Sequence, residues 1–386
     1  MKTSKKLEKI PPYLFQRIDK KKAEAKEKGI DLIDFGVGDP DLTTPIHIIN
    51  KMKEAITDPK YHNYPPYEGM LSFRKAVAGL YLKRFGVKLD PEKEVLSLIG
   101  SKEGFAHIFQ AFLDPGDISL VPNPAYRVYE MCTLLNNGEP YFMPLLEENG
   151  FLPEFSKIED KAIKKAKLMV INYPNNPTGA VADKEFLKEA VNFARKNEIL
   201  LCMDLAYSEI SYDGYMPPSI LEIDGAKDVA IEFHSLSKTY NMTGWRIGMV
   251  VGNEKAISAL GVVKSNIDSG IFKAIQIAGI EALTGPQNCI KEAVEIYRKR
   301  RDLFAEGLKE LGFRFNIPKA SFYFWVKNPH GYDSTGFAEY LLEKAGLVVV
   351  PGNGYGKYGE GYIRLTLTVP EEKIKEALNR LKNIKI

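Results

Sequence analysis

LMVINYPNNPTGAVADKEFLKEAVNFARKNEILLCMD, residues 168–204, contains the alternation of elements that decides the fold. The run 168–173 is apolar on both faces and leads into the turn-rich PNNPTG, after which apolar residues at helical spacing predict a helix. ILLCMD, residues 199–204, is a second run of the buried type. Two such runs joined through a helix predict neighbouring parallel strands in a sheet that is covered on both faces.

The same pattern continues on the C-terminal side of this stretch. VAIEFHS at 229–235 and RIGMVVG at 246–252 are further strand-like runs. The last third of the chain differs, because FYFWV at 322–326, LVVV at 347–350 and YIRLTLTV at 362–369 are strands with one clear helix among them. A C-terminal helix begins at Pro370, where the missing N–H of proline costs nothing.

These elements predict an α/β fold with two domains. The large domain has a mostly parallel sheet covered by helices on both faces, and the smaller domain is α+β. We place the large domain at 46–275 and build the small domain from 1–45 together with 276–386. A chain of 386 residues is long enough for two such cores.

Composition excludes several classes of protein. The 53 basic and 50 acidic side chains give a net charge of +3, which predicts no nucleic-acid partner. No window approaches the ~18 to 20 apolar residues of a membrane span. The charged N-terminus has no apolar stretch behind it, so we expect a cytoplasmic protein without a secretory signal. Three scattered cysteines and five histidines without ligand spacing predict no metal site.

Polar residues gather where the predicted parallel strands end, which is where ligands bind in open sheets of this kind. They are Asn175, Asn176, Asp204, Tyr207, Ser235, Ser237 and Lys238. A partly desolvated lysine has a lowered pKa and attacks carbonyl compounds. A lysine, a carboxylate for a pyridinium nitrogen and donors for a phosphate are what pyridoxal 5′-phosphate (PLP) requires. Lys238 and Asp204 fit the first two roles, and Asn176 and Tyr207 are suited to bond the ring hydroxyl.

A phosphate site is predicted from two further segments. Ser101 and Lys102 begin a helix pattern, and helix N-termini bind phosphate through free N–H groups. Ser235, Ser237 and Arg246 would complete the cup, the arginine through charged hydrogen bonds. Tyr126 could stack on the cofactor ring.

Arg364 stands inside an otherwise apolar strand, and a buried arginine needs a partner. The residues alone leave open whether that partner is a ligand carboxylate or an internal acid. Other single residues have ordinary explanations as well, since a lone lysine is usually a surface charge and a strand-end aspartate usually caps a turn.

SLSKTYNMTGWRIG, residues 235–248, resembles the cofactor-lysine motif of the fold-type I PLP enzymes of the class I/II aminotransferase family. YPNNPTG at 173–179 and DLAY at 204–207 are similar to other motifs of that family, and the match covers nearly the whole chain in order. Tyr173 departs from the asparagine of many members, but the functional Asn176 is kept.

The resemblance implies roles for particular residues. Lys238 would carry PLP and then move the substrate α-proton, while Asp204 would pair with the pyridine nitrogen. Arg364 and the backbone N–H of Gly38 would bind the substrate α-carboxylate, with Asn176 beside them. Tyr64 would reach the phosphate of a neighbouring subunit, which implies a homodimer with shared active sites.

Four stretches resemble the LL-diaminopimelate aminotransferases within that family: GSKEGFAH, FHSLSKTYNMTGWR, KSNIDSG and PGNGYGKYGEGY. This likeness implies amino transfer from glutamate to tetrahydrodipicolinate, with small-molecule amino acid and 2-oxo acid substrates and a second subunit as partners, and no nucleic acid or membrane. It also implies that Tyr13 and Asn266 contact substrate. An aspartate, alanine or broad-range aminotransferase stays open as the alternative.

Three rival interpretations come from other classes. GxGxxG at 354–359 is followed by a strand, not by the helix that a dinucleotide site needs. SLSK at 235–238 matches SxxK, but the SDN and KTG motifs of acyl enzymes of that type are missing. A non-catalytic PLP-fold regulator would need a DNA-binding region, which neither motif nor charge indicates.

Overall fold

A seven-stranded sheet forms the centre of the large domain in the computed structural model, which describes residues 1–11 and 14–385. The strand order is β2-β8-β7-β6-β5-β3-β4. Strands β3 to β7 run parallel, and β8 is antiparallel to both of its neighbours. The strands are β2 (Val95–Leu98), β3 (Ile118–Asn123), β4 (Glu139–Pro144), β5 (Ala166–Asn172), β6 (Leu200–Asp204), β7 (Ala230–Ser235) and β8 (Gly248–Gly252).

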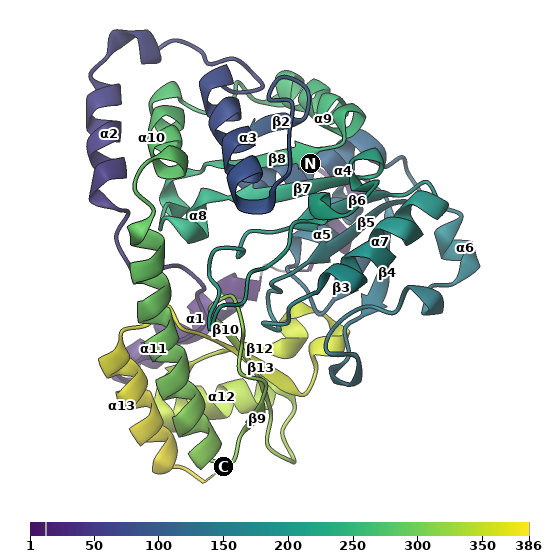
Figure 1. Cartoon of the computed structure of the whole chain (residues 1–386). Helices are drawn as coiled ribbons and strands as arrows, with labels where there is room; N and C mark the ends of the chain where they lie inside the picture. The colour runs from purple at the N-terminus through teal and green to yellow at the C-terminus, as the bar shows by residue number, and fades with distance from the viewer. Residues whose placement is uncertain (12–13, 386) are drawn as a thin grey trace.

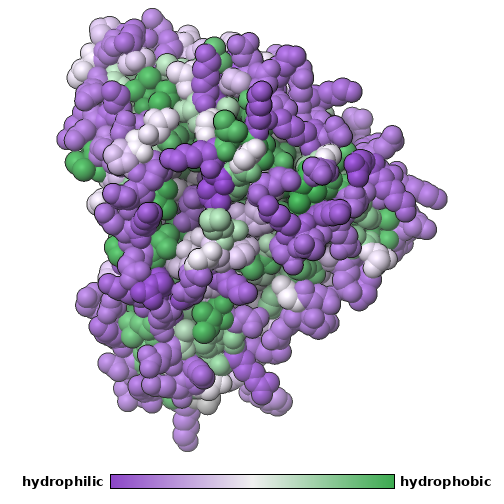
Figure 2. Space-filling model, viewed as in Figure 1, coloured by the Kyte–Doolittle hydropathy of each residue, from purple (hydrophilic) through white to green (hydrophobic). Residues whose placement is uncertain are grey.

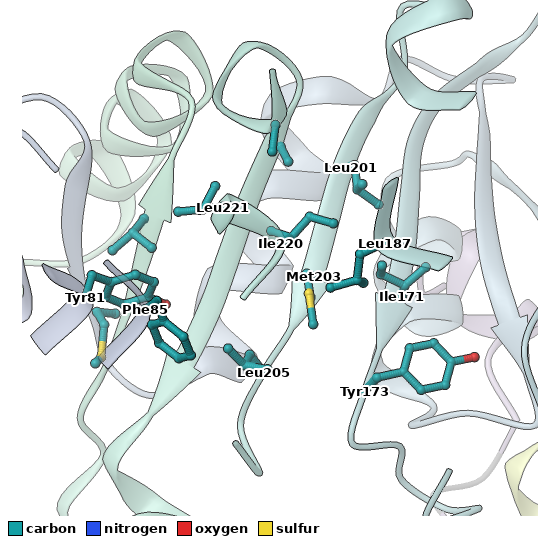
Figure 3. Close-up of a cluster of buried hydrophobic side chains, with 14 of the residues drawn as sticks. Tyr81, Phe85, Ile171, Tyr173, Leu187, Leu201, Met203, Leu205, Ile220 and Leu221 are labelled. Carbon is teal, nitrogen blue, oxygen red and sulfur yellow. The ribbon is translucent and has the colours of Figure 1, made fainter. Parts of the chain in front are cut away.

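Helices cover both faces of this sheet. Alternate residues of the central strands point to opposite sides, and the residues on both sides are apolar and need to be buried. Met169 and Ile171 of β5 join one apolar core with Leu187, as Figure 3 shows for Ile171 and Leu187. Leu168 and Val170 join a second core on the other face. The helices of this domain are α2 (Ile46–Ile56), α3 (Leu71–Phe85), α4 (Ser101–Phe112), α5 (Val128–Leu135), α6 (Asp160–Ile163), α7 (Lys184–Lys196), α8 (Leu236–Thr239), α9 (Glu254–Ile267) and α10 (Lys273–Thr284).

The small domain contains a four-stranded antiparallel sheet in the order β12-β13-β10-β9. A separate parallel pair joins β1 of the N-terminal arm to β11. The strands are β1 (Ile33–Asp34), β9 (Arg314–Phe315), β10 (Tyr323–Lys327), β11 (Leu347–Val348), β12 (Val350–Pro351) and β13 (Tyr362–Thr366), and the helices are α1 (Leu14–Glu27), α11 (Asn288–Glu310), α12 (Ser334–Ala345) and α13 (Glu371–Lys382).

The predicted architecture is confirmed, with a difference in one strand. The run 347–350 was expected to be a single strand, but it divides between two sheets, β11 pairing with β1 and β12 with β13. Its uninterrupted apolar sequence could not reveal this, because both halves are buried. The C-terminal helix starts one residue after Pro370, which is its N-cap.

The two domains have separate apolar cores. One core of the large domain includes Ala278, Ala282 and Leu283 of α10, whereas the small-domain core takes in Ala293 and later residues of α11 together with Phe35 of the arm. In Figure 1, α11 runs from the large domain down to the small one. The exact division of the chain, placed near residue 275, remains a prediction.

The surface is mostly hydrophilic in the view of Figure 2, with apolar residues in separate patches. Within residues 1–11 and 14–385, no helix combines the length and apolar composition that a membrane crossing needs.

Glu232 secures the strand that leads to the predicted cofactor lysine. It is fully buried in β7 and accepts hydrogen bonds from the Tyr81 hydroxyl (2.7 Å), the Ile220 N–H (2.8 Å) and the Ser219 hydroxyl (2.9 Å). Burial raises the pKa of Glu232 to about 7, although these donors oppose the shift.

We predict that Glu232→Gln removes a pH dependence of folding. The folded carboxyl, with its pKa near 7, binds a proton that the unfolded one has released at its ordinary pKa of 4.5. The stability of the wild type should therefore fall relative to the variant as pH rises from about 4.5 to 7, by ~2–3 kcal/mol. Urea denaturation across this pH range measures the difference, and parallel curves for both proteins would contradict it.

Candidate active site

A cavity of about 470 Å³ lies at the carboxyl ends of β5, β6 and β7 and extends to the small domain. The structure brings most of the predicted site residues into its lining. These are Gly38, Ser101, Lys102, Tyr126, Asn176, Asp204, Tyr207, Ser235, Ser237, Lys238, Arg246 and Arg364. Asn172, Tyr323 and Tyr355 line it as well, and the sequence alone did not single them out.

Asp204 is a buried acid at the last position of β6. The Tyr129 hydroxyl donates to its Oδ2 at 2.7 Å, and the Ala206 N–H donates to Oδ1 at 3.2 Å. Burial raises the pKa of Asp204 to about 6, and the two hydrogen bonds limit the rise. A buried carboxylate that only neutral donors accompany is suited to pair with a cationic ring nitrogen.

Asn172 ties the end of β5 to the end of β6. Its Nδ2 donates to the Asp204 carbonyl at 2.9 Å, and its Oδ1 accepts the Asn176 N–H at 2.9 Å. The one signal for Asn172 was a polar residue next to the end of the otherwise apolar run 168–173. Tyr129, on helix α5, had no signal, because a tyrosine on a helix is usually part of a core.

Lys238 faces the cavity from the short helix α8, which follows β7 directly. Its Nζ donates to the Gly38 carbonyl at 2.8 Å. Burial lowers the pKa of the Lys238 amine to about 8, Asp39 opposes this shift, and the charges of Arg364 and Arg246 add to it. A larger share of this amine is therefore neutral, and hence nucleophilic, near neutral pH than for an exposed lysine.

Three segments converge to form the predicted phosphate cup. Ser101 is the first residue of α4, and the N–H groups of a first helical turn have no partner within the helix. Gly100 precedes it with φ +77°, and a Cβ there would lie 2.3 Å from Nη2 of Arg246, so only glycine lets the guanidinium approach. The Ser235 hydroxyl caps α8 by accepting the Ser237 N–H at 3.1 Å.

Arg364 enters the cavity from β13 of the small domain and is 2% exposed. Its Nη1 donates to Asn176 Oδ1 at 2.9 Å and its Nη2 to the Gly36 carbonyl at 2.6 Å. The guanidinium carbon lies 4.2 Å from the Tyr323 ring centroid and 5.1 Å from that of Tyr355.

No carboxylate among the described residues forms an ion pair with Arg364, and its Nε is buried without a hydrogen-bond partner there. A buried guanidinium with an unused donor favours a ligand carboxylate over the internal salt bridge that the sequence left open. Asn176 gives its oxygen to Arg364, so its amide protons remain for a ring hydroxyl.

Two predicted residues lie outside this cavity. Tyr64 is 85% exposed, and Asn266 is exposed with its Nδ2 bonded to the Val262 carbonyl. Their segments adjoin, because a Cβ on Gly270 would lie 3.1 Å from the Pro66 carbonyl oxygen. Tyr13, the third predicted substrate contact, lies outside the described residues.

The lysine and the buried acid lie at the ends of parallel strands, and an anion cup and an arginine of the small domain complete the cavity. This arrangement defines a PLP-dependent transferase of fold type I. The groups present fit PLP. Asp204 would accept a hydrogen bond from the ring N–H, Asn176 and Tyr207 would donate to the ring hydroxyl, and the cup would hold the phosphate. The chain belongs to the family of class I and II aminotransferases, whose sequence model matches residues 30–381. Enzymes of this family depend on PLP.

Relatives extend the match over nearly the full length. An LL-diaminopimelate aminotransferase of Halothermothrix orenii is 56% identical over 383 residues, covering 99% of this chain and 98% of the relative. One from Moorella thermoacetica is 54% identical, covering 100% and 98%. Among solved structures, substrate-bound BacF from Bacillus subtilis has a TM-score of 0.95 at 40% identity, covering 99% of this chain and 97% of BacF. A single mutant of Thermus thermophilus aspartate aminotransferase has a TM-score of 0.92 at 31% identity, covering 98% of each chain.

We predict that PLP uptake by the apoprotein accelerates with pH around a midpoint near 8. Only the neutral Lys238 amine attacks the cofactor aldehyde, and burial places its pKa there. Rapid-mixing absorbance measurements follow the uptake, with Lys238→Ala as the control that forms no covalent band and cannot transaminate. A rate that keeps rising towards pH 10.5, the ordinary lysine value, would contradict the lowered pKa.

We also predict a graded loss of cofactor affinity at the buried acid. Asp204→Ala removes the partner of the ring nitrogen and should weaken PLP binding by tenfold or more, with slower proton transfer. Tyr129→Phe removes one hydrogen bond to the carboxylate and should cost about tenfold or less. Equilibrium titration of the apoproteins with PLP measures both, and unchanged affinity in Asp204→Ala would show that another acid has this role.

Proposed function

We propose that this protein is an LL-diaminopimelate aminotransferase that moves an amino group from glutamate to tetrahydrodipicolinate. The observation that carries the proposal is the uniform name of its relatives: eight matched over 98% or more of this chain, at 52–56% identity, are LL-diaminopimelate aminotransferases. The charged cavity supports it, because LL-diaminopimelate, the product of that transfer, has an amino acid group at each end.

The substrate would be held by its α-carboxylate. In the proposal, Arg364 uses its free Nε and the Gly38 N–H lies beside it. Arg364 is already fixed by Asn176 and Gly36, so little side-chain entropy is lost when the carboxylate binds. Tyr323 packs closely against Gly38. A Cβ at position 38 would lie 2.1 Å from the Tyr323 hydroxyl, so a side chain there would displace the tyrosine.

PLP, when bound, supplies an electron sink for the negative charge left at the substrate α-carbon. The chain's own residues would do the rest. Lys238 Nζ would accept the proton from the substrate α-carbon and later return it, and the Gly38 carbonyl, 2.8 Å away, holds the amine at the end of the cavity proposed for the substrate. Asp204 would stabilise a positive charge on the ring nitrogen. Tyr207, whose hydroxyl lies 3.1 Å from that of Tyr323, would donate to the ring hydroxyl together with Asn176.

We propose a cytoplasmic homodimer with shared active sites as the working form. Tyr64 and Asn266 are exposed and do not line the cavity of their own chain, and their neighbours Tyr67, Val262 and Ile267 are exposed large apolar residues. A second subunit would cover such residues and receive Tyr64 at its phosphate and Asn266 at its substrate. Tyr13 is proposed for the substrate as well.

The spectrum of the PLP-loaded protein tests the substrate. We predict that LL-diaminopimelate and glutamate each convert the absorption band of the bound cofactor to that of its amino form. Aspartate and alanine, added separately as controls, should convert it at least about tenfold less efficiently, because neither fills both ends of the site. Efficient conversion by aspartate or alanine alone would keep the aminotransferase and reject diaminopimelate as its substrate.

A further inference from the structure

A largely buried group of charges lies between α4 and α9, next to the predicted phosphate cup. Lys264 of α9 has a fully buried side chain, and its Nζ lies 2.9 Å from Asp268 Oδ1, 3.0 Å from Asp268 Oδ2 and 3.4 Å from Glu103 Oε1. His107 Nδ1 lies 2.5 Å from the same Glu103 oxygen. Burying these charges is costly, so their pairing has to be tight.

The three acceptor groups of Glu103, His107 and Asp268 lie within 4.8 Å of one another, a spacing that can hold a metal ion. The Lys264 ammonium already lies in contact with both carboxylates. It supplies the positive charge that a metal would otherwise bring. The group is therefore an internal ion cluster, and it connects two separate parts of the chain.

One side of the cluster belongs to the phosphate cup. Glu103 lies in the first turn of α4, two residues after Ser101, and its Oε2 accepts the Ile99 N–H at 2.9 Å. Glu103 thus fixes the chain just before the N-terminal turn that the cofactor phosphate would contact.

The other side of the cluster holds the exposed segments that contain Asn266 and Tyr64. Asp268 is the C-cap of α9, and its Oδ1 also accepts the Gly270 N–H at 2.7 Å in the turn towards the next helix. Asn266 and Ile267 directly precede Asp268 and are exposed. Gly270 in turn adjoins Pro65 and Pro66, next to Tyr64. Lys264 therefore holds, through the Asp268 carboxylate, the turn at Gly270. Asn266 precedes this turn, and the segment of Tyr64 packs against it.

We propose that Lys264 is a positioning residue that fixes the end of α9 and the loop after it, residues 266–270, relative to the phosphate cup and so sets substrate affinity in the neighbouring subunit. The proposal rests on the proposed homodimer, in which Asn266 and Tyr64 reach the other active site. Lys264 touches neither substrate nor cofactor, so its effect passes through Asp268 and the loop.

Kinetics of the PLP-loaded Lys264→Met protein provide the first test. Without the ammonium the loop loses its anchor, so KM for the amino acid should rise about fivefold or more while kcat stays within about twofold. Lys255→Met, on the exposed side of the same helix, is the matched control and should leave both constants unchanged. Asp268→Asn keeps the shape of the side chain and should change KM in the same direction by less.

Hybrid dimers distinguish an effect of the loop on the neighbouring subunit's active site from an effect on the active site of its own subunit. One hybrid pairs a Lys264→Met subunit with a Lys238→Ala subunit. Its only competent site lies in the Lys264→Met subunit and receives an intact loop from the partner, so KM should be normal. When one subunit has both substitutions and the other is wild type, the competent site receives the loosened loop, and KM should be raised. A raised KM in the first hybrid, or equal values in both, would overturn the proposal.

Hydrogen–deuterium exchange tests the anchor without using activity. In Lys264→Met, amides of residues 268–272 should exchange about tenfold faster or more, while those of α10 stay protected. Unchanged exchange in this loop would overturn the proposal even if the protein transaminates. Absence of transamination in the wild type would refute the proposed function instead, and the exchange result would still decide whether Lys264 anchors the loop.

Discussion

The buried guanidinium of Arg364 is the interaction on which the rest of the site depends. It comes from the small-domain sheet, yet it donates to Asn176 in the large domain and to the Gly36 carbonyl in the N-terminal arm. Three distant parts of the chain therefore meet at one charge, which stacks on Tyr323. Burying a charge is costly unless its donors are used, so the free Nε supports the proposal that a substrate carboxylate binds here.

The second constraint is the direction of the parallel strands. Because β5, β6 and β7 all end at one edge of the sheet, the residues that follow them meet although they are far apart in sequence. Asp204 and Lys238 therefore face the same cavity, and burial shifts their pKa values in opposite directions. Burial favours the neutral form of each, raising the pKa of the acid and lowering that of the amine. A cofactor with a cationic ring nitrogen and an aldehyde satisfies both.

Much of this could be predicted from the sequence, because apolar runs, helix stripes and polar strand ends are local signals. The large sheet and the strand-end residues Asp204 and Lys238 followed from such signals. Tyr129 could not be predicted, since its contact with the acid arises only from packing of α5 on the sheet. Lys264 left a weak signal that was missed: it continues the inward stripe of Ala256 and Leu260 on α9, where a charge needs buried partners. The division of 347–350 between two sheets depends on pairing with strands far along the chain.

The measurement that tests the central claim most directly is peptide mass spectrometry of the PLP-loaded protein after borohydride reduction. Reduction fixes the cofactor permanently to the amine that holds it. The account predicts a single modified peptide with the cofactor on Lys238, the lysine that α8 presents to the cavity. Labelling of another lysine, or no label with PLP in excess, would contradict the assignment of this cavity as the active site.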